Sequence, residues 1–392
     1  MKKNKYALVI GASIESIFAI KTAQELGYKV IAFDGNIDAP GLKYADNSYI
    51  TDITNPKNII DILTKENIYP QIVLPVPIGR YLITTGAIND YYGLVGPTLR
   101  NADICTDKYL FHKILYESNL RNIFCKCIKK REDINASDLI YPCILKPRFG
   151  SGSRNVFAIL SENDFNKNIE SLLPYNEDMI VETLVGGVEF GVDGVVLNGQ
   201  YKQVLLREKS NTDFPYRQCI GYYSVTEKNL YNKIEKFMQE IISALNLKNC
   251  LLHADLIYNQ KTLFIIELSP RPSGHNLHNK FTILATGVNM IKEYIYYVNG
   301  EKYSFLPKYN KNLLMRFYDF ENCKIIKVPD FINLKEEFNI LDYKCNIEKN
   351  ERLSIIKDGH SIIDRGYIII EGENRSELKT KSEKIMNMFI KE

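Results

Sequence analysis

An apolar segment that ends in alternating polar residues constrains this chain more than any other feature. Residues 264–272 read FIIELSPRP, so that Glu267, Ser269 and Arg271 stand two positions apart. Side chains at alternate positions of a strand share one face, so these three would point the same way provided that Pro270 does not end the strand early. The segment therefore predicts a polar face on an otherwise apolar strand.

A second acid, Asp255, lies in the preceding apolar run, residues 251–258. Residues 259–261, NQK, join the two runs and predict a short hairpin turn. Pairing of the runs would bring Asp255, Glu267 and Arg271 onto one sheet face. Hard cations such as Mg²⁺ take oxygen ligands and usually share them with substrate phosphates, so the hairpin predicts a metal–nucleotide site. The alternative is a surface ion pair, which would contribute about 0–1 kcal/mol.

Length and composition narrow the class of protein. At 392 residues the chain exceeds what one core usually supports, so two or three domains are expected. The net charge of +3, without a long basic block, gives no reason to expect nucleic acid as a partner. No run approaches the roughly 18–20 apolar residues that span a bilayer, so no membrane partner is expected. Eight scattered cysteines favour a reduced, cytoplasmic location.

The first hundred residues alternate between strands and helices. Apolar strands are expected at 6–10, 30–33 and 72–74, with a helix around 56–66. This alternation predicts an α/β lobe with a parallel sheet. Gly11 followed by Asp34 invites a dinucleotide-binding interpretation, but the sequence GASIES has one glycine where three are wanted, so NAD binding is not favoured.

The next segment carries a lysine and a glycine-rich loop. Thr106 or Asp107 is expected to cap a helix that begins near Lys108. A strand at 141–146 ends in Lys146, the loop 147–154 reads PRFGSGSR, and another strand follows at 156–159. Strand, loop and strand predict a hairpin flap and not a P-loop. The loop could fold over phosphates, or it could be a mobile surface hairpin.

The remaining expectations concern a second strand pair and three helices. A strand ends at Glu182, and Gly186 and Gly187 lead into a strand with Glu189 and Asp193 on one side. Helices are expected at 228–246, about 281–298 and 376–391.

In this order and spacing, the segments resemble an ATP-grasp ligase nearly from end to end. The resemblance implies an α/β fold with an α+β grasp core. It assigns 1–105 to a Rossmann-like pre-ATP-grasp domain, 106–303 to the ATP-grasp domain with a flap subdomain at about 121–185, and 304–392 to a small C-terminal lobe. The residues that carry it are Lys108, Lys146 with its glycine loop, Glu182, Glu189, Asp255, Glu267 and Arg271.

The resemblance also implies how ATP would bind. Lys108 and Lys146 would contact its phosphates, and Glu189 would accept hydrogen bonds from the ribose. Glu182 and Leu184 would lie at the hinge, where backbone groups contact the adenine edge. The loop that closes over the phosphates would contain Gly150, Ser151, Gly152 and Ser153.

Mg²⁺, or Mn²⁺ in its place, would be held by Asp255, Glu267 and Ser269, and Arg271 would stabilise the transferred phosphoryl group together with Lys146. Two positions depart from the usual pattern. Ser269 stands where many members have Asn, and serine is a weaker metal ligand. Asp255 replaces the commoner Glu, which shortens the reach by one methylene.

The loop after Arg271 would line the acceptor side through Ser273, Gly274 and His275. His275 could act in acid–base chemistry or bind a substrate carboxylate. His275 and His278 together could suggest zinc, but two histidines without further ligands are weak evidence. His253, two residues before Asp255, could simply orient that acid.

These observations predict an ATP-dependent carboxylate–amine ligase that joins amino acids or similar small acids through an acyl-phosphate. Its partners would be a small-molecule carboxylate and an amine, and a homodimer is expected from the family. One alternative is bicarbonate or formate activation, which the sequence ELSPRP resembles. Another is a protein that binds nucleotide without turnover.

Overall fold

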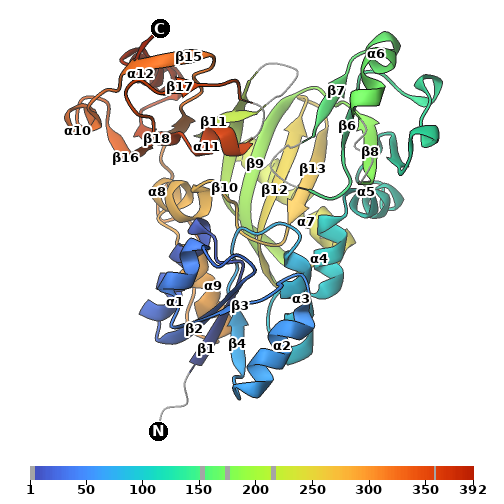
Figure 1. Cartoon of the computed structure of the whole chain (residues 1–392), viewed down its shortest axis with the longest axis vertical. Helices are drawn as coiled ribbons and strands as arrows, with labels where there is room; N and C mark the ends of the chain where they lie inside the picture. Colours follow the sequence, from blue (N-terminus) through green and yellow to red (C-terminus); the bar gives the residue numbers. More distant parts are fainter. Residues whose placement is uncertain (1–4, 151–154, 173–176, 213–217, 357–358) are drawn as a thin grey trace.

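The computed structural model describes residues 5–150, 155–172, 177–212, 218–356 and 359–392. These residues form four sheets, and the largest runs through the middle of the molecule (Figure 1). One lobe lies below this sheet and one lies at each upper side of it. Helices with parallel and antiparallel sheets confirm the predicted α/β class.

The lower lobe contains a four-stranded parallel sheet in the order β3-β2-β1-β4. The predicted alternation of strands and helices is confirmed here. Its helix α2 begins where the Asn55 side chain accepts a hydrogen bond from the Lys57 N–H, with Pro56 in the first turn. The elements are β1 (Lys5–Ile10), η1 (Ile14–Ser16), α1 (Ile17–Glu25), β2 (Tyr28–Asp34), η2 (Pro40–Tyr44), β3 (Asn47–Ile50), α2 (Pro56–Lys65), β4 (Pro70–Val73), α3 (Leu82–Tyr92) and α4 (Leu99–Thr106).

The flap lobe has an antiparallel sheet in the order β5-β8-β6-β7. Strands β6 and β7 pair as the predicted hairpin, with Cys143 opposite Ile159. Asp107, one of the two expected caps, accepts hydrogen bonds from the first backbone N–H groups of α5. The elements are α5 (Lys108–Glu117), β5 (Cys125–Ile128), η3 (Arg131–Asp133), η4 (Ala136–Asp138), β6 (Cys143–Pro147), β7 (Phe157–Ile159), α6 (Glu162–Leu172) and β8 (Met179–Thr183).

The central sheet has eight antiparallel strands in the order β13-β12-β9-β10-β11-β14-β18-β16. The predicted hairpin is present as β12 and β13, and β13 ends at Ser269, directly before Pro270. Arg271 therefore lies just beyond the strand. The strands are β9 (Val188–Leu197), β10 (Gln200–Asn211), β11 (Cys219–Ser224), β12 (Cys250–Tyr258), β13 (Leu263–Ser269), β14 (Leu313–Phe317), β16 (Ile340–Cys345) and β18 (Gly366–Glu371).

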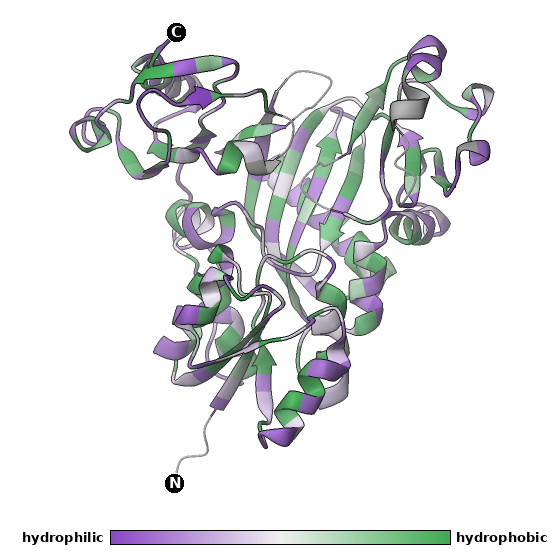
Figure 2. Cartoon of the chain, viewed as in Figure 1, coloured by the Kyte–Doolittle hydropathy of each residue, from purple (hydrophilic) through white to green (hydrophobic). Residues whose placement is uncertain are grey.

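The two faces of this sheet have different partners. One face packs on α7 (Lys228–Leu245), with Val192 and Leu252 against Ile234 and Met238. On the other face, Val195 and Leu251 pack on α9 (Met290–Val298). Apolar and polar residues consequently alternate along the central strands (Figure 2). Leu205 and Tyr222 extend the second face into a further apolar cluster with Phe281 and Ala285. Polar side chains also lie on this face.

Residues beyond 303 continue the central sheet through β14, β18 and β16. The domain limits drawn from the sequence stay a prediction. The other elements are β15 (Cys323–Lys327), α10 (Phe331–Leu334), β17 (Arg352–Leu353), α11 (Gly359–Ile363), α12 (Arg375–Asn387) and β19 (Ile390–Lys391). In the part of the chain that the structure describes, no helix has the length and apolarity needed to cross a membrane.

A single helix at 281–298 was predicted, and this is wrong. A π-helical turn η5 (Leu277–Phe281) and a short helix α8 (Thr282–Thr286) precede α9. Gly287, with a φ of +73°, ends α8 in the left-handed conformation that favours glycine. The Asn289 side chain then caps α9 by accepting a hydrogen bond from the Lys292 N–H.

Candidate active site

Two rows of polar residues cross the second face of the central sheet. In one row Asp255 on β12 lies opposite Glu267 on β13 and Gly191 on β9. In the next row His253 lies opposite Ser269 and Asp193. The strand register thus brings together the acids that the sequence placed on two separate runs.

Asp255 and Glu267 offer oxygen ligands to a cation. Their carboxylate oxygens and a ring nitrogen of His253 lie within 4.8 Å of one another. Asp255 Oδ2 accepts a hydrogen bond from Lys209 Nζ at 2.5 Å, while the buried Oδ1 has no hydrogen-bond partner among the described residues. Burial would raise the pKa of Asp255, but Lys209 outweighs it and holds the value at about 2. A charged carboxylate with a free buried oxygen fits a hard divalent cation such as Mg²⁺.

Lys146 and Glu182 form a buried ion pair at the flap. Lys146 Nζ donates to Glu182 Oε1 at 2.5 Å, and Arg121 Nη2 donates to Oε2 at 2.9 Å. Burial would raise the pKa of Glu182, but Arg121 and Lys146 hold it at about 2. Lys146 lies on β6 and Glu182 on the adjacent β8, so the sheet fixes both. Sequence reasoning did not find Arg121, which is supplied by the segment after α5.

A cleft where the lower lobe, the flap lobe and the central sheet meet contains Lys108. Its Nζ donates to the carbonyl oxygen of Gly150 at 2.7 Å, which joins the start of α5 to the start of the flap loop. Burial lowers the pKa of Lys108, and Glu267 opposes this effect. The predicted loop residues Ser151, Gly152 and Ser153 lie outside the residues that the structure describes. The same cleft is lined by Arg80, Thr106, Lys108, Gly150, Glu267, Ser269 and Arg271.

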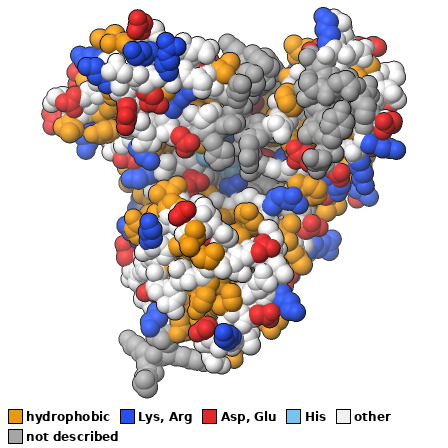
Figure 3. Space-filling model, in the orientation of Figure 1, with side chains coloured by type: hydrophobic (Ala, Val, Ile, Leu, Met, Phe, Trp, Pro, Cys, Tyr) orange, Lys and Arg blue, Asp and Glu red, His pale blue; other side chains and the backbone are white. Residues whose placement is uncertain are grey.

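The open face of the molecule is hollowed between the three lobes. Basic, acidic and histidine side chains gather at this hollow (Figure 3). Two of the predicted nucleotide contacts, Glu189 for the ribose and Leu184 at the hinge, already have hydrogen-bond partners within the chain. Glu189 accepts a hydrogen bond from Asn211 Nδ2 at 2.9 Å. The backbone N–H of Leu184 donates to the Pro142 carbonyl at 3.0 Å, so this N–H would have to leave that bond to contact a purine.

Arg271 connects the end of β13 to the lower lobe. Its Nε donates to the Ile78 carbonyl at 2.9 Å and its Nη1 to the Pro272 carbonyl at 2.8 Å. Burial lowers the pKa of Arg271, while Glu267 and Glu15 favour its charged form. The guanidinium is thus fixed by backbone carbonyls beside two acids.

The predicted acceptor loop touches an acid that sequence reasoning missed. Glu15, in η1 of the lower lobe, accepts a hydrogen bond from the Asn276 N–H at 3.3 Å. A Cβ added to Gly274 would lie 3.0 Å from Glu15 Oε2, so glycine gives this carboxylate its room. His275 adopts a φ of +61° in the same loop, and Ser273 is fully buried. No motif marks Glu15, because its neighbour in space lies 261 residues away in the chain.

His278 has a packing role. It is buried, and its Nδ1 lies 2.5 Å from the Ser273 carbonyl oxygen. Among the described His, Cys, Asp and Glu residues, the one cluster of three that suits a metal is His253, Asp255 and Glu267. The cluster contains neither His275 nor His278, which gives no support to a zinc site on this loop.

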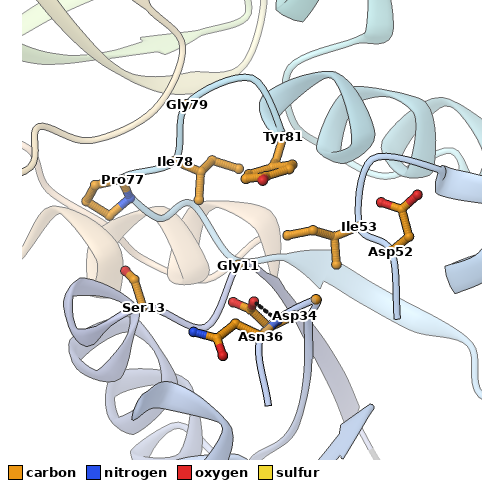
Figure 4. A pocket seen from close by; sticks show the side chains of 11 residues that line it. Gly11, Ser13, Asp34, Asn36, Asp52, Ile53, Pro77, Ile78, Gly79 and Tyr81 are labelled. Carbon is orange, nitrogen blue, oxygen red and sulfur yellow. Dashed lines mark hydrogen bonds between the residues drawn. The ribbon is translucent and has the colours of Figure 1, made fainter. Parts of the chain in front are cut away.

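A cavity of about 380 Å³ lies at the carboxyl edge of the parallel sheet in the lower lobe (Figure 4). Its walls include Gly11, Asp34, Asn36 and Tyr81. Asp34 Oδ2 accepts from the Ala12 N–H at 2.7 Å and Oδ1 accepts from the Asn36 N–H at 2.8 Å. A dinucleotide ribose would need the carboxylate of Asp34 as a hydrogen-bond acceptor. Both of its oxygens already accept hydrogen bonds from backbone N–H groups.

Comparison with known proteins agrees with this geometry. One segment of the chain, residues 139–279, matches the ATP-grasp domain family. The matched range contains Lys146, Glu182, the three metal-binding candidates and the acceptor loop. Lys108 and the whole lower lobe lie outside it.

The relatives to which this chain is similar have different names. The chain is 22% identical to the carbamoyl phosphate synthase large chain of Clostridium acetobutylicum, over 93% of this chain and 35% of the relative. It is 26% identical to D-alanine–D-alanine ligase B of Clostridium perfringens, over 44% of this chain and 59% of the relative. The chain thus spans about a third of the length of the synthase chain and somewhat more than half of the length of the ligase.

A solved structure shares the complete fold. The L-amino acid ligase from Bacillus licheniformis superposes with a TM-score of 0.80 at 15% identity, covering 99% of this chain and 98% of the ligase. At this identity the likeness shows that the two chains share their fold across all three lobes.

Proposed function

We propose that this ATP-grasp protein is an ADP-forming ligase that joins a carboxylate to an amine, with amino acids or similar small acids as substrates. The observation that carries the proposal is the cleft that Lys108, Glu267 and Arg271 line, with Asp255 directly opposite Glu267 in the sheet. Two cations and one acid in a cleft, with a second acid beside the first in the sheet, suit a polyphosphate and its metal ion. The names of the ligases to which the chain is similar support the amino-acid class.

The chemistry has two steps. A carboxylate oxygen attacks the γ-phosphorus of ATP, the bond to the β-phosphate oxygen breaks, and ADP leaves with that oxygen. The amine nitrogen then attacks the carbonyl carbon of the acyl-phosphate, phosphate leaves with one former carboxylate oxygen, and the nitrogen loses a proton. Activation is needed because the negative charge of a free carboxylate repels the electron pair of an amine.

The side chains of this chain would position the reactants and neutralise charge. Lys108 and Lys146 would hold the phosphates, with Lys146 shared between Glu182 and the nucleotide. Asp255 and Glu267 would hold Mg²⁺, which supplies positive charge to the phosphates. Ser269, as the last residue of β13, would be the weakest metal ligand. Arg271 would stabilise the transferred phosphoryl group.

The remaining candidates would bind the rest of ATP and the acceptor. Glu182 and Leu184 would lie at the adenine hinge, Glu189 would bind the ribose, and residues 150–153 would close over the phosphates and exclude water. Ser273, Gly274 and His275 would line the acceptor side. The homodimer expected from the family stays a prediction.

An isotope experiment tests the proposal directly. Purified protein is incubated with Mg-ATP and a panel of amino acids, singly and in pairs, whose carboxylates carry oxygen-18. The proposal expects ADP release that needs one acid–amine pair, with one labelled oxygen atom in each phosphate. The variant Lys146→Ala, with an unchanged circular dichroism spectrum, should form no product.

Three results would contradict the proposal in different ways. ADP release that needs bicarbonate or formate would move the function to the alternative substrate class. ADP release with unlabelled phosphate would exclude an acyl-phosphate. ATP binding without ADP release under any condition would indicate a nucleotide-binding protein without turnover.

A further inference from the structure

His253 lies between a buried arginine and the metal-binding candidates. Its Nδ1 is 3.2 Å from Arg207 Nη2, and its Nε2 is 3.8 Å from Asp255 Oδ1. The side chain is 13% exposed, so it borders the site without facing bulk solvent. By position alone, His253 could be a third metal ligand beside Asp255 and Glu267.

Arg207 is held in place from two sides. Its side chain is 0% exposed, and its Nε donates to Asp193 Oδ2 at 2.9 Å. Gly191, opposite Arg207 in the register of β9 and β10, leaves the space that the guanidinium occupies. A Cβ at Gly191 would lie 2.5 Å from Arg207 Nη1. The guanidinium can cross β9 to reach His253 because that strand carries no side chain there.

The chemistry of the two groups fixes the hydrogen on the ring. A guanidinium has five N–H donors and no acceptor, so Nδ1 of His253 must accept from Arg207. A neutral imidazole with a bare Nδ1 carries its hydrogen on Nε2. Nε2 is the ring atom that faces Asp255. A nitrogen that carries a hydrogen has no lone pair for a metal ion.

We propose that Asp193 and Arg207 fix His253 as a hydrogen-bond donor, so that its Nε2–H binds an anionic oxygen beside Asp255 and Glu267 and the metal site consists of oxygen ligands alone. That the oxygen belongs to a phosphoryl or carboxylate group rests on the proposed ligase function. The tautomer and the absence of a metal–nitrogen bond do not depend on that function.

Two other histidines provide an internal comparison. His112 Nδ1 faces Arg121 Nη1, so it is also bare and His112 also carries its hydrogen on Nε2. His278 Nδ1 faces the Ser273 carbonyl, which can only accept, so its hydrogen lies on Nδ1. One protein thus supplies both tautomers as references.

Nitrogen NMR of the free protein tests the tautomer. Protein labelled with nitrogen-15 histidine is measured near neutral pH, and the variants His253→Gln, His112→Gln and His278→Gln assign the signals. The proposal expects the Nε2–H pattern for His253 and His112 and the Nδ1–H pattern for His278. An Nδ1–H or a doubly protonated pattern for His253 would overturn it. This result does not depend on ligase activity.

Pulsed electron paramagnetic resonance of Mn²⁺ with ADP tests the ligand set. The proposal expects no histidine nitrogen coupling to Mn²⁺, and a spectrum that is unchanged in His253→Gln. A nitrogen coupling that disappears in this variant would overturn it. If Mn²⁺ and ADP do not bind at all, the proposed ligase function fails, while the NMR result still decides the tautomer.

Steady-state kinetics with the substrates found above test the donor role. Gln can both accept from Arg207 and donate an N–H, and Ala can do neither. A lost hydrogen bond to a charged oxygen should lower kcat/KM of His253→Ala by about 10- to 100-fold, with unchanged Mn²⁺ affinity. His253→Gln should recover most of this loss. Equal kcat/KM for wild type and His253→Ala would overturn the donor role.

Discussion

Two sheets of this molecule each carry an acid at a position that resembles part of a ligand-binding motif. The two acids differ in their hydrogen-bond partners. Asp34, at the end of β2, is bound by the backbone N–H groups of Ala12 and Asn36. Asp255, on β12, is bound by the side chain of Lys209. A backbone amide cannot leave without unfolding its loop, whereas a lysine side chain can rotate away.

The comparison teaches that the partner of an acid, more than its place in a motif, separates a structural carboxylate from a ligand-binding one. Asp34 stabilises the loops around the cavity in Figure 4. In the proposed function Asp255 would exchange Lys209 for a metal ion, and Glu267 stands directly opposite it.

The largest effect is expected for Glu267→Gln. Loss of one metal-binding carboxylate should remove several kcal/mol of charge stabilisation, which lowers the rate of ADP release by about 10³-fold. The free energy of unfolding in urea should change little, because Glu267 lies beside another acid and also beside the cations Lys108 and Arg271. Full activity in this variant would place the metal elsewhere, and a large loss of stability would make Glu267 a structural acid like Asp34.

Arg207→Met should have the largest effect on stability. It leaves the buried Asp193 without its ion-pair partner, which should lower the free energy of unfolding by about 3–5 kcal/mol. Arg375→Met is the matched control, since Arg375 pairs with Glu208 in an exposed position and should cost at most about 1 kcal/mol. Urea unfolding compares the two variants, and equal losses would contradict a buried role for Arg207.

Acidification should expose the role of Glu182. Its folded-state pKa of about 2 lies below the ordinary value of 4.5, so the charged form stabilises the fold above about pH 4.5. This contribution, of order 3 kcal/mol, is lost as the pH falls from about 4.5 to about 2. Urea unfolding of wild type and Glu182→Gln should therefore differ strongly at neutral pH and converge in acid. A difference in unfolding free energy that stays constant with pH would contradict a lowered pKa of Glu182.

The smallest effect is expected for Asp34→Asn. An amide keeps one acceptor oxygen but loses the charge that both backbone N–H groups contact, which should cost about 1–2 kcal/mol of stability. ADP release should not change. A loss of activity without a loss of stability would make the cavity of the lower lobe a binding site.

Local sequence signals predicted much of the fold. Alternation of apolar residues identified the β12–β13 hairpin and the β6–β7 flap, and the cap pattern identified the start of α5, where Asp107 is one of the two caps it offered. The break at Gly287 was missed because apolar residues continue at helical spacing on both sides of it. Glycine followed by a capping Asn289 was the available signal.

The cations that surround the predicted acids were not predictable in the same way. Arg121, Arg207 and Lys209 reach Glu182, Asp193 and Asp255 through strand pairing and chain packing, at sequence separations of 61, 14 and 46 residues. No local pattern specifies such pairs. Gly191 is informative only once its neighbour on β10 is known.

The most direct measurement is the affinity for ADP by calorimetry, with and without Mg²⁺, in wild type, Glu267→Gln and Asp34→Asn. The account predicts that Mg²⁺ tightens ADP binding in wild type and in Asp34→Asn, and that Glu267→Gln loses about 10-fold or more of this gain. An undiminished Mg²⁺ effect in Glu267→Gln would contradict the claim that the acids of the β12–β13 hairpin hold the metal.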